Sequence, residues 1–338
     1  MLISLLFAAL TTLSLSGETK KNVYIYFKSN ENKKYYYLLG KDTFYNEIFG
    51  TKYAVILTNT LKDLKDAAYI VTEEVPLYDL QYAFLAHYPK NKVLLFSFEA
   101  PLTQTRSQQK EYHQYYSKIF TWCDDLIDSI KYFKVRYPWT DPLPMITNRL
   151  EFEAKKLCVF VAGYNYIEAP CSNHPERMHM IEFFEKNYPN YFDLYGPSWQ
   201  VFHYSCYKGI IPLGQTNKIS RMNKINVIKN YKFDMCYENA QGLNGYVTER
   251  IFDAFAAGCI PIYCGAKNIE DYISKNCFIA LADFKSYEDL YSFMTHMTRE
   301  EYDRYIRNIQ EYLTSQIPEQ LTTRSYIENI RRVLNITD

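Results

Sequence analysis

This sequence contains little glycine and little proline, and it carries no net charge. Its 338 residues include only 11 Gly and 13 Pro, which excludes a collagen-like or low-complexity chain. The 38 Lys and Arg balance the 38 Asp and Glu, and a net charge of zero argues against a nucleic-acid-binding protein with a broad basic face. Apolar residues make up 48% of the chain, and 34 residues are Tyr. This composition indicates a globular protein whose tyrosines mostly fill strands and core.

Signatures of metal sites and of common nucleotide-binding loops are also missing. The sequence has no Asp-x-Asp, His-x-x-x-His or Cys-x-x-Cys pair, and neither a G-x-x-x-x-G-K-[ST] nor a G-x-G-x-x-G loop. These absences argue against a zinc hydrolase, a nucleotide triphosphatase and a dinucleotide-dependent dehydrogenase. We therefore assign no metal ligands, and we interpret the acidic cluster of Asp124, Asp125 and Asp128 as the solvated start of a helix.

An apolar run at residues 2–15 stands apart from the rest of the chain. It is shorter than the roughly 20 residues that a membrane-spanning helix needs. Ser14-Leu15-Ser16 is a small-x-small cleavage pattern, so we expect residues 1–16 to be a secretory signal peptide. No Lys or Arg precedes the run, which leaves a short uncleaved anchor or a buried N-terminal element as alternatives.

Short β-rich runs alternate with helix-length segments along the remainder of the chain. Continuous apolar strands in this arrangement are typical of parallel sheets covered by helices on both faces. The ten runs form two groups of five, at residues 23–27, 53–58, 68–72, 93–98 and 119–122, and at 157–162, 192–195, 233–237, 259–264 and 277–281. They predict two doubly wound α/β domains.

The boundary between these domains is marked by proline. Three prolines between Tyr137 and Pro144 disfavour both a helix interior and a central strand. We therefore expect one domain at residues 20–145 and a second at residues 150–338. Apolar residues at helical spacing from Tyr302 to Leu313, and a last segment at 326–334, predict that the second domain ends in helices.

The most informative segment runs from Tyr231 to Gly265. It reads as a strand (FDMCY), a polar loop (ENAQGLNG), a helix (VTERIFDAFAA) that Gly258 ends, and a second strand (CIPIYC). In such a βαβ unit the loop lies at the carboxyl end of its strand, where open α/β sheets bind ligands. The helix start, with its free N–H groups and partial positive charge, is suited to bind phosphate.

Two charged residues at this helix start are open to two interpretations. Arg250 is poorly placed for the helix dipole unless an anion offsets its charge, whereas Glu249 suits the dipole and could accept sugar hydroxyls. Alternatively, the two form an ordinary ion pair on a solvated face.

The same segment resembles the signature of the α-1,3/4-fucosyltransferases of glycosyltransferase family ten, most closely the bacterial branch. The matching residues are Tyr-Lys-Phe at 231–233, Glu238-Asn239, Gly245-Tyr246-Val-Thr-Glu249-Arg250, Ile260-Pro261-Ile262 and Gly265. The family usually has Lys where this chain has Arg250, so the charge is kept while the geometry of its contacts changes.

Further matches extend outward from this segment. Arg177, in Pro175-Glu-Arg-Met, matches the family's phosphate-binding Arg, and Asp193-Leu-Tyr-Gly196 resembles the turn near the base pocket. Residues 163–174 form a longer loop than the family usually has. Phe98-Glu99-Ala-Pro101 resembles the step whose Glu is the proposed catalytic base.

The resemblance implies a GT-B arrangement, in which two Rossmann-like domains face a cleft. It implies an inverting transfer of L-fucose from GDP-β-L-fucose, bound by the second domain, to a hydroxyl of GlcNAc or Glc in an oligosaccharide, bound by the first, in α-1,3 or α-1,4 linkage. It assigns Glu99 as the base, and it places phosphate on Arg177, Arg250 and Asn239, and ribose or base on Tyr246, Glu249 and Gly196. The alternatives are a GT-B transferase with another GDP-sugar and a catalytically silent sugar- or nucleotide-binding protein.

Cofactors, partners and location follow the same reasoning. No cofactor is required by the sequence, although stimulation by Mn²⁺ is compatible with it, and GDP-fucose is a co-substrate. We expect a glycoconjugate acceptor, no nucleic acid, and peripheral association with a membrane. The expected location is the secretory pathway or Golgi in a eukaryote, and the exported or membrane-peripheral fraction in a bacterium.

Overall fold

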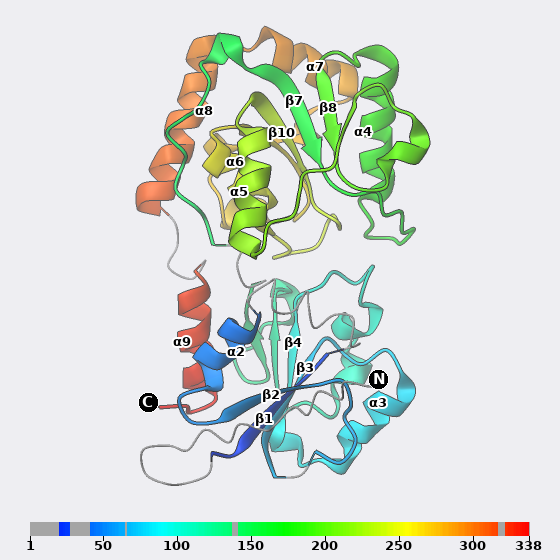
Figure 1. Ribbon diagram of the computed structural model, residues 1–338, viewed down its shortest axis with the longest axis vertical. Coiled ribbons are helices and arrows are strands. Elements are labelled where there is room, and N and C mark those ends of the chain that lie inside the picture. The colour runs from blue at the N-terminus through cyan, green and yellow to red at the C-terminus, as the bar shows by residue number, and fades with distance from the viewer. Residues whose placement is uncertain (1–19, 28–40, 65, 137–140, 317–321, 338) are drawn as a thin grey trace, which may run out of the picture.

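A computed structural model describes residues 20–27, 41–64, 66–136, 141–316 and 322–337 of the chain. These residues form two α/β units stacked along the long axis of the molecule (Figure 1). Each unit contains a sheet of six strands, and every pair of neighbouring strands is parallel. The expected signal peptide at residues 1–16 and part of the expected boundary, residues 137–140, lie outside the described residues.

The first unit has the strand order β2-β1-β3-β4-β5-β6. Its strands are β1 (Asn22–Tyr26), β2 (Ala54–Thr58), β3 (Ala67–Glu73), β4 (Val93–Ser97), β5 (Lys118–Thr121) and β6 (Tyr132–Lys134). Every residue of the central strand β4 is buried, which explains its uninterrupted apolar sequence. Helix α2 (Lys41–Phe49) packs on one face of this sheet, and α3 (Asp79–Phe84) lies among the elements of the other.

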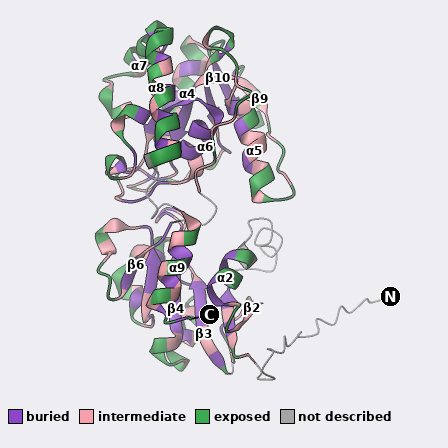
Figure 2. Cartoon of the chain, turned by 90° about the vertical axis from the view of Figure 1, so that its left-hand side faces the viewer, coloured by how far each residue is buried: buried purple, intermediate pink, exposed green. Residues whose placement is uncertain are grey.

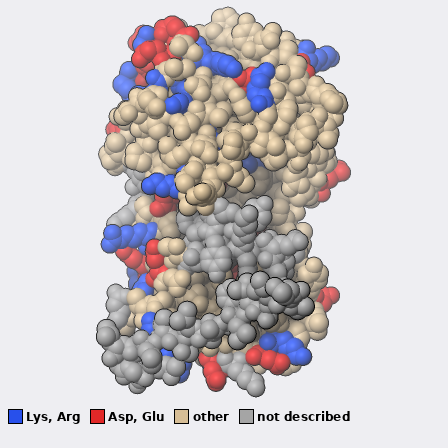
Figure 3. Space-filling view, viewed as in Figure 1, with Lys and Arg blue, Asp and Glu red and all other residues tan. Residues whose placement is uncertain are grey.

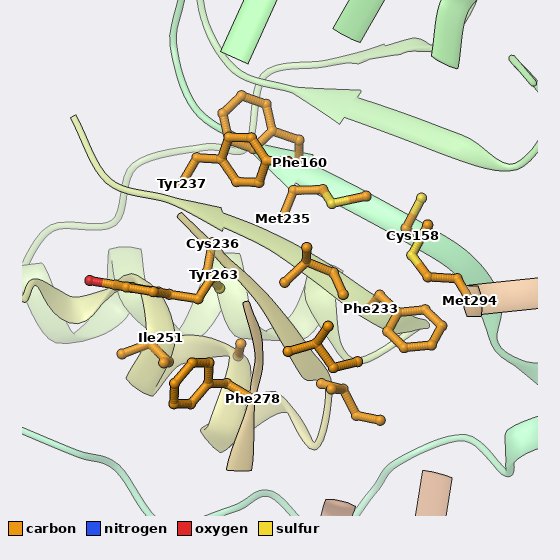
Figure 4. Close-up of a cluster of buried hydrophobic side chains, with 14 of the residues drawn as sticks. Cys158, Phe160, Phe233, Met235, Cys236, Tyr237, Ile251, Tyr263, Phe278 and Met294 are labelled. Atoms are coloured by element: carbon orange, nitrogen blue, oxygen red, sulfur yellow. The ribbon is translucent and has the colours of Figure 1, made fainter. Parts of the chain in front are cut away.

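The second unit has the strand order β12-β11-β10-β7-β8-β9. Its strands are β7 (Lys156–Val161), β8 (Phe192–Tyr195), β9 (Tyr207–Gly209), β10 (Tyr231–Tyr237), β11 (Ile260–Cys264) and β12 (Ile279–Ala280). Its helices are α4 (His174–Asn187), α5 (Asn217–Ile228), α6 (Glu249–Ala257), α7 (Tyr287–His296) and α8 (Arg299–Glu311). Figure 4 shows part of its core, where Phe160, Phe233, Met235 and Tyr263 pack together.

The burial pattern follows from these layers. Buried residues concentrate on the strands, whereas α7 and α8 expose their outer faces (Figure 2). Charges of both signs lie near one another on the face drawn in Figure 3. Among the residues that the structure describes, no helix is both long and apolar enough to cross a membrane.

All ten predicted strands are present, with ends that differ by at most two residues, and two further strands were not predicted. The missed strands β6 and β9 have three residues each, too few to show a recognisable period. The predicted helix after the polar loop is α6, and Gly258 occupies its C-cap as expected.

The expected extent of the second domain, residues 150–338, is wrong for the last helix, α9 (Thr323–Val333). Its buried residues Tyr326, Ile327 and Ile330 join the core of the first unit. The Arg331 guanidinium donates to the backbone carbonyl of Glu47 in α2 at 3.1 Å, and the two helices lie side by side in Figure 1. The sequence reveals an apolar face on this helix but not which unit covers it.

The acidic cluster does begin a short 3-10 helix (Asp124–Leu126), and Asp125 and Asp128 are exposed as predicted, but Asp124 is not simply solvated. Asp124 accepts hydrogen bonds from Lys134 (2.6 Å) and, across the contact between the units, from Tyr272 (2.5 Å) and Asn268 (2.9 Å). Burial opposes ionisation of this carboxyl, but these three donors outweigh it and hold the pKa of Asp124 below its usual value. Asp124 therefore ties the two units together.

Candidate active site

A cavity of about 430 Å³ lies where the two units face each other. The first unit contributes Phe98 and Glu99, which follow β4, and the second contributes the ends of β7 and β8 and the start of α6. This volume falls within the range of about 300–1,000 Å³ typical of small-molecule sites. Six of the seven predicted site residues line the cavity: Glu99, Gly196, Asn239, Tyr246, Glu249 and Arg250.

Two glycines allow the backbone to approach closely around this cavity. Gly196 has a φ of +143°, and a Cβ there would lie 2.0 Å from the carbonyl oxygen of Ala162 at the end of β7. Gly245 has a φ of +86°, and a Cβ there would lie 2.4 Å from the carbonyl oxygen of Trp122 in the first unit. Larger residues at either position would push apart the segments that form the cavity.

The start of α6 is fixed by a buried carboxylate. Glu238 accepts a hydrogen bond from the backbone N–H of Thr248 at 2.8 Å and another from its hydroxyl at 2.6 Å. Thr248 is the N-cap residue of α6, and its hydroxyl accepts from the backbone N–H of Arg250 at 3.5 Å. This arrangement directs the first turn of α6, with Glu249 and Arg250, toward the cavity.

Two arginines meet at one amide oxygen. Arg177 and Arg250 each donate to the side-chain oxygen of Asn239, at 2.9 Å and 3.5 Å. Arg177 is 5% exposed, lies behind Asn239 and is the one predicted site residue that does not line the cavity. Burial, reinforced by the charge of Arg250, lowers the pKa of Arg177 to about 9.

A histidine beside this pair adds no charge at neutral pH. Burial, followed by the charges of Arg177 and Arg250, lowers the pKa of His174 to about 4. Its ring Nδ1 accepts a hydrogen bond from the backbone N–H of Ile167 at 2.9 Å. The local positive charge therefore comes from the two arginines.

Helix α5 adds two cations that the sequence did not single out. Arg221 and Lys224 line the cavity and reach the buried carboxylate of Asp253, at 2.8 Å and 3.2 Å. The spacing of residues 221 and 224 puts both on one helical face, but only the fold places that face on the cavity.

These cations also affect the neighbouring carboxyl of Glu249. Burial opposes ionisation of Glu249, but the charges of Lys224 and Arg250 hold its pKa below the usual value. Glu249 is therefore a carboxylate at neutral pH.

Across the cavity, the segment that carries Glu99 is held by its neighbours. The indole N–H of Trp122 donates to the carbonyl oxygen of Glu99 at 3.1 Å, and the Thr103 hydroxyl donates to its carboxylate at 3.5 Å. The Trp122 ring packs edge-on against Tyr246, with 4.9 Å between centroids. Burial, with the charges of Glu238 and Glu99, raises the pKa of Tyr246 well above its usual value, so its hydroxyl stays protonated.

Comparison with known proteins places the second unit's part of this site in a family. The family described as glycosyltransferase family 10 (fucosyltransferase), C-terminal part, matches residues 164–330. Residues 164–330 belong to glycosyltransferase family 10. This region contains six of the seven predicted site residues: Arg177, Gly196, Asn239, Tyr246, Glu249 and Arg250.

Individual relatives match over a shorter stretch. The α-(1,3)-fucosyltransferase FucT of Helicobacter pylori is 36% identical over 75 residues, which are 22% of this chain and 16% of that protein. An α-(1,4)-fucosyltransferase of Arabidopsis thaliana is 33% identical over 70 residues, which are 21% of this chain and 17% of that protein. The match therefore spans about a sixth of the length of these relatives.

The whole fold is shared more widely than the sequence. A crystal structure of α1,3-fucosyltransferase matches with a TM-score of 0.60 over 98% of this chain and 94% of that chain, at 16% identity. A structure of α1,3-fucosyltransferase with GDP-fucose matches with a TM-score of 0.57 over 94% and 91%, also at 16% identity. The expected architecture, two Rossmann-like units in the GT-B arrangement, is thereby confirmed.

Among the described residues, no group of three or more His, Cys, Asp or Glu side chains is arranged to hold a metal ion. The charged groups around the cavity are Arg221, Lys224, Glu249, Arg250 and Asp253 on one side and Glu99 on the other. Such an arrangement can bind an anion and accept a proton from a neutral group.

Proposed function

We propose that this chain is an inverting fucosyltransferase that moves L-fucose from GDP-β-L-fucose to a hydroxyl of GlcNAc or Glc in an oligosaccharide, through an α-1,3 or α-1,4 linkage. The observation that carries the proposal is that Arg250 and Asn239, with Arg177 bonded to the far side of that amide oxygen, line one cavity together with Glu99 of the other unit. The relatives support the donor, since one matching structure is that of an α1,3-fucosyltransferase with GDP-fucose.

The arginines suit a departing diphosphate. Two guanidinium groups that share one amide oxygen repel each other, and the carboxylate nearest to Arg250 is Glu238, with 3.8 Å between Nε and Oε2. Glu238 is fully buried and already accepts two hydrogen bonds from Thr248. An anion bound at Arg250 and the start of α6 would offset the repulsion and accept charge-assisted hydrogen bonds. Arg177 would contribute mainly through its charge and through Asn239.

Glu99 suits the incoming hydroxyl. The acceptor oxygen forms a bond to the anomeric carbon of fucose while the carbon–oxygen bond to the diphosphate breaks and its electron pair leaves with GDP. The hydroxyl proton passes to the Glu99 carboxylate. Because the cations stabilise the leaving group, no second carboxylic acid is needed. Attack from the side opposite the diphosphate inverts the configuration of the anomeric carbon.

The remaining cavity residues suit the nucleoside. The ionised Glu249 is placed to accept hydrogen bonds from ribose hydroxyls, and Tyr246 and the turn at Gly196 provide the adjoining walls. Arg221, Lys224 and Asp253 extend this polar wall along α5 and α6. Export and peripheral membrane association stay predictions from the sequence.

The test is a transfer assay read by mass spectrometry, with GDP-fucose and GDP-mannose offered against a panel of galactose-containing oligosaccharides. We expect addition of one fucose to acceptors that contain GlcNAc or Glc, and greater thermal stabilisation by GDP-fucose than by GDP-mannose. The opposite preference would favour a transferase for another GDP-sugar. Binding without transfer to any acceptor would favour a silent binding protein.

The variant Glu99→Gln separates the base from the donor site. Loss of a general base is expected to reduce turnover by about 10²- to 10⁴-fold. GDP affinity should stay at the wild-type value, because Glu99 faces the donor cations from the other unit. Glu111→Gln, an exposed glutamate of the same unit that does not line the cavity, serves as the matched control. Wild-type turnover in Glu99→Gln would refute the role of Glu99.

A further inference from the structure

A second glutamate lies directly behind Glu99, in a conformation that is unusual for its residue type. Glu74 follows the last residue of β3, is 7% exposed and has a φ of +64°. Left-handed backbone favours Gly, Asn or Asp, and burial disfavours a carboxylate. Two unfavourable features at one residue indicate that its side chain makes contacts that a more suitable residue would not make.

Those contacts are made to the segment that carries Glu99. The Oε1 atom of Glu74 accepts hydrogen bonds from two consecutive backbone N–H groups, that of Phe98 at 2.5 Å and that of Glu99 at 2.8 Å. The other carboxylate oxygen accepts from the hydroxyl of Ser97 at 3.1 Å, and Ser97 in turn accepts from Gln108 at 2.7 Å.

Sheet geometry explains why a side chain is needed here. Strands β3 and β4 are parallel, and the backbone N–H of Glu74 still donates to the carbonyl of Phe96 at 2.8 Å. The left-handed turn at Glu74 then ends β3, so its backbone carbonyls no longer follow β4. The side chain of Glu74 takes over as acceptor for the next two N–H groups of the neighbouring segment.

We propose that Glu74 is a positioning residue: its Oε1 atom fixes the backbone of residues 98–99 and thereby holds the Glu99 carboxylate toward the cavity. This inference rests on the proposed function, in which Glu99 accepts the proton of the acceptor hydroxyl. Glu74 itself does not line the cavity.

The test compares Glu74→Ala with Glu74→Gln in the full chain. The amide oxygen of Gln can still accept both backbone N–H groups, whereas Ala removes the acceptor that Oε1 provides. We expect Glu74→Ala to reduce kcat by about 10- to 100-fold, in line with a misplaced base, with unchanged affinity for GDP and unchanged KM for GDP-fucose. Glu74→Gln should restore kcat to within about fivefold of the wild type.

Asp128 provides the matched control. Its Oδ1 atom also accepts backbone N–H groups, those of Ile130, Lys131 and Tyr132 at 2.8–2.9 Å, in the same unit but away from the cavity. Asp128→Ala should lower the melting temperature and leave kcat unchanged. A Glu74→Ala variant with wild-type kcat, or a Glu74→Gln variant as impaired as Glu74→Ala, would overturn the proposal.

Two readouts keep this result separate from the proposed function. Absence of transfer by the wild-type chain would count against the proposed function alone. Hydrogen exchange at the amides of Phe98 and Glu99 tests the positioning role without turnover: it should accelerate in Glu74→Ala and stay slow in Glu74→Gln. Equal exchange in both variants and the wild type would contradict the role of Oε1. If Glu74→Ala does not fold, Glu74→Asp, whose shorter side chain cannot reach both N–H groups, replaces it with the same expected outcome.

Discussion

Replacing Glu74 by Gln should change how the stability of the first unit depends on pH. Burial is the main cause that raises the pKa of Glu74 from 4.5 to about 7, against the hydrogen bonds that it accepts. The folded chain therefore holds this proton more tightly than the unfolded chain. The resulting stability is fully present below about pH 4.5 and is lost as the pH rises through about 7.

The size of the effect follows from the same two values. A difference between 4.5 and about 7 corresponds to a loss of about 3 kcal/mol in the free energy of unfolding between acid and mildly alkaline pH. Glu74→Gln lacks the titrating group but keeps an oxygen for both N–H groups. Its stability relative to the wild type should therefore rise by about 2–3 kcal/mol between pH 4.5 and pH 8.

The assay must report on the first unit alone, since a chain of two units need not unfold in one step. Hydrogen exchange measured by mass spectrometry across a urea series, at pH 4.5 and pH 8, gives the free energy of opening for peptides of β3 and β4. Asp234→Asn is the matched control, because burial raises the pKa of Asp234 to about 6 in strand β10 of the second unit. It should produce its effect in β10 peptides and not in β3 or β4. Parallel loss of stability in wild type and Glu74→Gln would show that Glu74 does not titrate in this range.

Further predictions concern the donor site and the last helix. Arg250→Ala should weaken GDP binding by about 1–3 kcal/mol, the scale of a charge-assisted hydrogen bond, and Arg177→Ala should weaken it through the loss of its charge and of its bond to Asn239; unchanged calorimetric affinity in both would contradict the phosphate assignment. Ile330→Ala, at a fully buried position of α9, should destabilise the first unit by about 2–5 kcal/mol and leave GDP affinity intact; destabilisation confined to the second unit would contradict the packing of α9.

The part of the cavity that we assign to the donor could be located from the sequence because its residues are close together in the chain. The strand, loop and helix from Tyr231 to Gly265 fold as one βαβ unit, so Asn239, Glu249 and Arg250 reach one cavity through short connections. Glu99 was identified through a resemblance and could not have been paired with these residues from spacing alone, since its place depends on how two separate sheets face each other.

The contacts behind the site were not predictable in this way. Glu74 reads as an ordinary residue after a strand, and only the left-handed turn at that position brings its carboxylate beneath residues 98–99. Arg221 and Lys224 read as solvated residues of a polar helix until α5 is packed against α6 and Asp253. Both cases depend on tertiary packing, which a local sequence pattern does not contain.

Two unfavourable arrangements lie at the place where the proposed reaction would use them. Arg177 and Arg250 repel each other at Asn239, and Glu74 combines burial with a left-handed backbone under Glu99. Both arrangements lower the stability of the unliganded chain. Each also orients a charged group before substrate binds: the arginines are held at Asn239, and Glu99 is held by Glu74. A diphosphate bound beside Arg250 would offset the repulsion between Arg177 and Arg250, so part of its binding free energy would be used to overcome that repulsion. The unfavourable burial and backbone conformation of Glu74 are not offset in this way, because no cation among the described residues forms an ion pair with its carboxylate. They therefore persist through the whole cycle, as the fixed position of a base requires.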